Sequence, residues 1–162
     1  LMPDAERCSL LREKLTLAGQ LVALSDEAGH RRTMVTSEAL VQGTVALVAE
    51  ARDILLTLVA ESAGDDAADI DCLATLRARV GDQPGEVQVL SASAAASDSW
   101  WSRLEALLAR QQEAGRRGSQ PRDPGVIAVA AAGPDCSPEA LRSLISDFRD
   151  YFETFVERHN QW

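Results

Sequence analysis

Two histidines, three cysteines and one acidic cluster are the side chains of this sequence whose types could do chemistry. Histidine is the usual acid–base group near neutral pH and a common metal ligand. Neither His30 nor His159 has a second histidine or a cysteine at ligand spacing, and each lies where a helix is expected to end. Both are therefore predicted to be solvated helix-end residues. The one Glu-x-x-His match, Glu27 to His30, lacks the second copy that a di-metal helical bundle requires.

Acidic residues are densest between Glu61 and Asp71. A calcium-binding loop needs a glycine after three alternating ligands and a glutamate at its twelfth position. Gly64 precedes these acids instead, so the cluster is predicted to be a solvated turn that also caps a helix. A phosphate-binding loop is absent as well, because Lys14 is the only lysine and no glycine precedes it. We expect no metal, no cofactor and no catalytic residue.

The three cysteines, Cys8, Cys72 and Cys136, are isolated from one another in the sequence. An odd number without a Cys-x-x-Cys pair fits neither a disulfide framework nor a zinc site. Such thiols are mostly small apolar residues of the core. We therefore predict three buried structural thiols and a reducing, cytoplasmic compartment.

Trp100, Trp101 and Trp162 are the residues best suited to an interaction surface. Consecutive residues of a helix point about 100° apart, so we expect one of Trp100 and Trp101 in the core and the other at its boundary. An exposed tryptophan is a common anchor of protein interfaces. The alternative is a rim tryptophan that only covers one end of the fold. Trp162 is either exposed or docked back onto the protein.

The elements that must position these residues are helices. Apolar residues recur at helical spacing, with matching caps and stops, over residues 4–28, 33–62, 68–80, 98–114 and 137–162. Residues 84–90 are predicted to be a short helix, although the alternation at 86–90 also fits a strand, which would have no partner. Residues 91–97 are a predicted joint. Residues 124–130 are either extended chain laid across the helices or one or two helical turns.

The first two segments carry most of the expected core. The apolar stripe of 4–28 is wide, and it comprises Cys8, Leu11, Leu15, Ala18 and Val22 with the neighbours Leu10, Leu17, Leu21 and Leu24. The segment 33–62 is the most apolar and is the expected centre of the fold. Gly43 interrupts its pattern, and close helix packing is a plausible reason for a glycine there.

The composition agrees with this pattern and excludes several functions. The chain has 162 residues, which favours one domain, 1–162, and it carries few aromatic residues. Its 25 acidic residues outnumber 16 basic ones, for a net charge of −9. That balance argues against a nucleic-acid partner and against an anionic membrane surface. No apolar run is long enough for a membrane span.

The sequence resembles a small family of uncharacterised bacterial proteins. The matching features are a helix start at Asp98-Ser99-Trp100-Trp101 followed by Leu104, a Val126-Ile127-Ala128 segment, and a terminal helix over 137–162. The resemblance covers most of the chain. It implies an all-helical cytoplasmic protein and brings no activity or catalytic residue.

We therefore expect an all-α, single-domain, up-down helical bundle with four main helices and one or two short ones. The leading functional hypothesis is a non-enzymatic interaction or scaffold protein, with a homodimer as one form. One alternative is a small-molecule binder or enzyme with a pocket between helices, where Arg52, Asp53 or Tyr151 would face inward. Another is an amphipathic coat protein on an apolar granule or lipid surface.

Overall fold

The computed structural model describes residues 3–27, 33–66, 70–117 and 133–160. These residues form six helices and no strand, which confirms the all-α prediction. The helices are α1 (Ala5–Glu27), α2 (Met34–Ser62), α3 (Leu73–Val80), α4 (Gly85–Ala95), α5 (Trp100–Arg117) and α6 (Pro138–Asn160).

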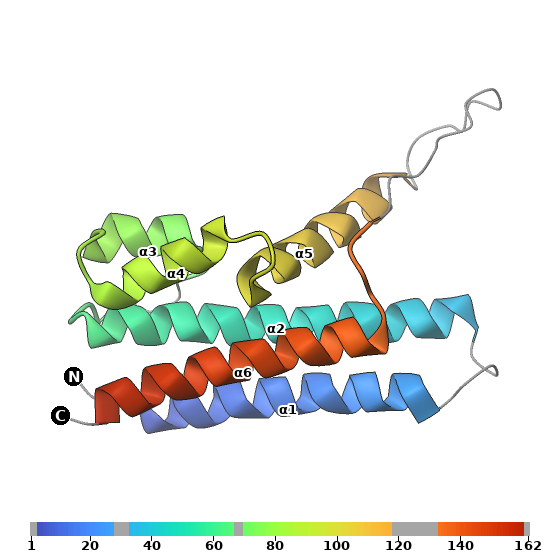
Figure 1. Ribbon diagram of the computed structural model, residues 1–162, viewed down its shortest axis with the longest axis horizontal. Helices are drawn as coiled ribbons and strands as arrows, with labels where there is room; N and C mark the ends of the chain where they lie inside the picture. The colour runs from blue at the N-terminus through green and yellow to red at the C-terminus, as the bar shows by residue number, and fades with distance from the viewer. Residues whose placement is uncertain (1–2, 28–32, 67–69, 118–132, 161–162) are drawn as a thin grey trace.

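Two long helices form the frame on which the others pack. α1 and α2 make an antiparallel hairpin, and α6 lies alongside them (Figure 1). The short helix α3 packs at the end of α2 that is distant from the hairpin turn, α4 packs against α3 and α5, and α5 is inclined to the long helices. All six helices contribute to one hydrophobic core, so the described residues behave as a single packed unit.

Helix ends follow the capping signals in the sequence. The Asp4 carboxylate accepts hydrogen bonds from the backbone of Glu6, at 2.8 Å, and of Arg7, at 3.3 Å. At the start of α6 the Ser137 hydroxyl accepts one from the backbone N–H of Ala140, 3.2 Å away. These bonds satisfy amide groups that a helix leaves without internal partners. The predicted start of the last helix is therefore confirmed.

Gly43 of α2 is the glycine whose lack of a side chain matters for packing. A Cβ atom at this position would lie 3.0 Å from Cδ1 of Leu21 in α1. The glycine lets the two helices of the hairpin approach closely, as the sequence suggested. It also fixes their register, together with Lys14, whose Nζ lies 2.5 Å from Oε2 of Glu50.

Three predicted boundaries are wrong. α3 begins at Leu73 and not at 68, because the Cys72 sulfur caps it by accepting a bond from the Thr75 amide at 3.4 Å. α4 continues through most of the predicted joint to Ala95, since the alanines there favour a helix. The cap of α5 is Ser99 rather than residue 97 or 98. Residues 124–132 lie outside the described part of the chain.

The wide apolar stripe of the first helix splits into two faces. Its core face is buried and consists of Cys8, Leu11, Leu15, Ala18 and Val22. Leu10, Leu17 and Leu24 are exposed by 41%, 44% and 50%. We call these three residues the leucine row. They are seven residues apart, so they follow one side of α1 over nearly its whole length.

Candidate functional site

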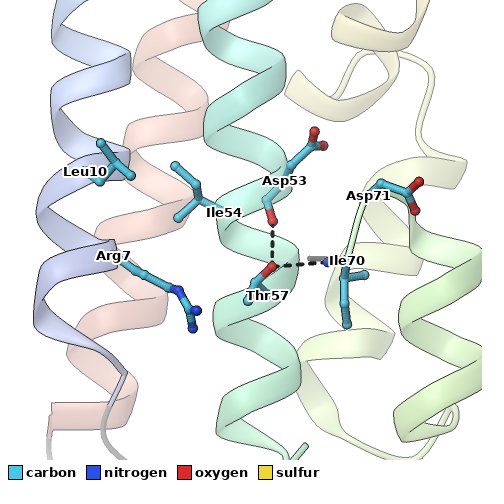
Figure 2. A pocket seen from close by; sticks show the side chains of 7 residues that line it. All are labelled: Arg7, Leu10, Asp53, Ile54, Thr57, Ile70 and Asp71. Atoms are coloured by element: carbon cyan, nitrogen blue, oxygen red, sulfur yellow. Dashed lines mark hydrogen bonds between the residues drawn. The ribbon is translucent and has the colours of Figure 1, made fainter. Parts of the chain in front are cut away.

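A groove of about 420 Å³ opens where α1, α2 and the segment before α3 meet (Figure 2). Arg7 and Leu10 line it from α1, while three residues of α2 and two that precede α3 complete it: Asp53, Ile54, Thr57, Ile70 and Asp71. The volume is within the range of sites that take small molecules. Arg7 and Leu10 lie on one side of the groove, Ile70 and Asp71 lie together on the other, and the residues of α2 stand between them (Figure 2).

Thr57 holds the two sides of the groove together. Its hydroxyl donates a hydrogen bond to the backbone carbonyl of Asp53 at 3.2 Å and accepts one from the amide of Ile70 at 3.3 Å. Thr57 is itself buried. These bonds tie the chain just before α3 to α2, and they thereby fix where Asp71 stands relative to Asp53 (Figure 2).

Asp53 is the carboxylate whose titration the groove alters most clearly. Burial raises the pKa of Asp53 above its ordinary value, and the nearby charges of Asp71 and Glu50 raise it further. The Arg52 guanidinium acts in the opposite direction through its charge and its hydrogen bonds, of which the shorter is 3.3 Å. The carboxylate therefore loses some of its preference for the charged form when the protein folds.

Arg52 connects this groove to a second, smaller cavity of about 220 Å³ between α2, α3 and α5. Its side chain is only 12% exposed. The guanidinium lies 5.4 Å from the ring centre of Trp101, and it pairs with Glu105 as well as Asp53. A guanidinium over an indole face is a favourable cation–π arrangement. Arg52 thus faces inward, as one of the alternatives for this chain expected.

The expectation of one boundary tryptophan is wrong. Trp100 and Trp101 are 5% and 6% exposed, so neither offers an exposed anchor. The reason is that α5 begins between two helices: Trp100 stacks on Phe148 of α6 at 4.1 Å, whereas Trp101 lies under Arg52 of α2. Although the two indoles point about 100° apart, each points into the interior of the protein, one toward α6 and the other toward α2. Trp162 lies outside the described residues.

Tyr151 of α6 faces inward too, beside Trp100, with 5.6 Å between the ring centres. Burial raises the pKa of Tyr151 far above its ordinary value, and the charge of Glu86 adds to the shift. The Tyr151 hydroxyl and the Trp100 Nε1 are both buried without a hydrogen-bond partner. A buried polar atom of this kind costs folding free energy.

Two acids of the acidic cluster pair with arginines. Glu61 pairs with Arg7, and Oδ2 of Asp65 lies 2.9 Å from Nε of Arg79. This arrangement fits the predicted solvated turn; Asp69 lies outside the described residues. Within the described ranges no three histidine, cysteine, aspartate or glutamate side chains form a group that could hold a metal ion.

Among the described residues, His159 and the three cysteines remain to be placed. The His159 Nδ1 lies 2.8 Å from the backbone oxygen of Phe155 at the end of α6, and His30 lies outside the described residues. All three cysteines are free. The prediction of three buried thiols is wrong for Cys72, which is exposed because its sulfur caps α3, and Cys136 is half-buried.

The chain matches the model of a family of unknown function, DUF6586, over residues 12–162. It belongs to this family. The match confirms the resemblance to an uncharacterised helical family, while a bacterial origin stays a prediction. No curated protein and no solved structure matches the chain. None of the described helices of this DUF6586 protein is long and apolar enough to cross a membrane.

Replacing Tyr151 by phenylalanine is expected to stabilise this DUF6586 protein by about 1 kcal/mol, because the change removes a buried hydroxyl that has no partner. Urea unfolding monitored by circular dichroism measures the difference. Thr154→Val on the exposed side of the same helix is the control, and it should change the stability little. A loss of stability in Tyr151→Phe would show that the hydroxyl is satisfied in solution.

Proposed function

We propose that this DUF6586 protein is a helical interaction or scaffold protein, built on an up-down bundle of α1, α2, α5 and α6, that pairs with a second copy of itself through the leucine row. The observation that carries the proposal is the regular exposure of Leu10, Leu17 and Leu24. Helix pairs in coiled coils bury apolar residues at two positions of each heptad, and the leucine row supplies one of these positions. The buried tryptophans give the proposal no support.

Small exposed residues lie near the leucine row. In the register of the hairpin, Leu17 and Leu24 of α1 lie level with the half-buried Leu47 and Leu40 of α2, and the adjacent Ala46 and Ala39 are exposed. Small residues next to protruding ones give one surface both ridges and shallow grooves. Such a surface is self-complementary, which is what a two-fold interface between identical chains requires.

The charges of α1 favour an antiparallel pairing. With a two-fold axis at Leu17, Leu10 of one copy faces Leu24 of the other, and Arg7, which also pairs with Glu61 of its own chain, faces Glu27. The two ends of the interface then bring opposite charges together. A parallel pairing would instead place each Glu27 against its own counterpart, and like charges there would oppose association.

A lipid or granule surface is the other occupant that an exposed apolar row could meet. The net charge of −9 disfavours an anionic bilayer, and the row is only one residue wide on α1. The second copy is therefore favoured. Flotation with phosphatidylcholine vesicles separates the two: the self-pairing proposal expects the protein to stay at the bottom of the gradient, and quantitative flotation would overturn it.

Salt should strengthen the pairing, because two chains of charge −9 repel each other and apolar contact supplies the attraction. Sedimentation velocity from about 50 to 500 mM NaCl tests this, since screening shortens the Debye length across that range. We expect the dissociation constant to fall severalfold. A constant that rises with salt would show an interface held by ion pairs, and a single monomer boundary at every salt concentration would contradict self-pairing.

A further inference from the structure

We draw no further inference here: the strongest candidate, the groove of about 430 Å³ between α1 and α6 that Arg142 and Arg149 line beside Gly19, carries none, because Arg142 already pairs with Asp26 and nothing in the described part of the chain shows what would occupy the groove.

Discussion

Replacing Trp100 by alanine is expected to lower the free energy of unfolding by about 3–5 kcal/mol. The indole is buried, and it stacks on Phe148 at 4.1 Å with an interplanar angle of 2°. Truncation would leave a large cavity and remove the contact that joins the start of α5 to α6. Because single domains are stable by only about 5–15 kcal/mol, this is a large share of the total. Urea unfolding with an unchanged m value measures it.

Trp100→Phe is the matched control for that experiment. Phenylalanine keeps an aromatic ring against Phe148 and removes the Nε1 hydrogen that has no partner. We expect it to cost less than about 1.5 kcal/mol, as for other conservative core changes. If Trp100→Ala were as mild as this control, the indole would have to be solvated in solution, and the buried position of α5 would be incorrect.

Replacing Leu17 and Leu24 by glutamate is expected to abolish self-pairing, with a dissociation constant at least about 100-fold larger. Each copy would lose two apolar contacts and gain two charges, so a symmetric interface would meet four buried carboxylates. The fold itself should change little, because both leucines are about half exposed in the single chain. Light scattering after size-exclusion chromatography measures the mass of the variant.

Val89→Glu is the control for the leucine variants. Val89 is also a partly exposed apolar residue, at 39%, but it lies on α4 away from the leucine row. A charge placed there should leave self-pairing intact. If both sets of variants dissociated the protein equally, the added charge rather than the leucine row would be responsible.

The sequence predicted the helices well because their signals are local. The serine, proline and acid at the start of α6 and the apolar spacing of α2 act within one or two turns of a helix. Gly43 was also correctly linked to close packing, since few other reasons place a glycine inside so apolar a helix.

The site could not be predicted in the same way. The groove joins Arg7, Asp53 and Asp71, which come from three separate segments and meet only when the helices pack. The burial of Trp101 depends likewise on where α5 enters the fold, next to Arg52. Arg52 and Asp53 are nonetheless among the inward-facing candidates predicted for the alternative with a pocket between helices. The sequence also did not separate the exposed leucine row from the buried face of α1, and only the structure shows this difference.

The measurement that tests self-pairing most directly is the mass of the unmodified chain in solution, by light scattering at physiological salt over a series of protein concentrations. The chain has a mass of 17.4 kDa, and we predict that the measured mass rises to twice this value as the concentration increases. A mass of 17.4 kDa at every concentration up to the solubility limit would contradict the proposal that the leucine row binds a second copy.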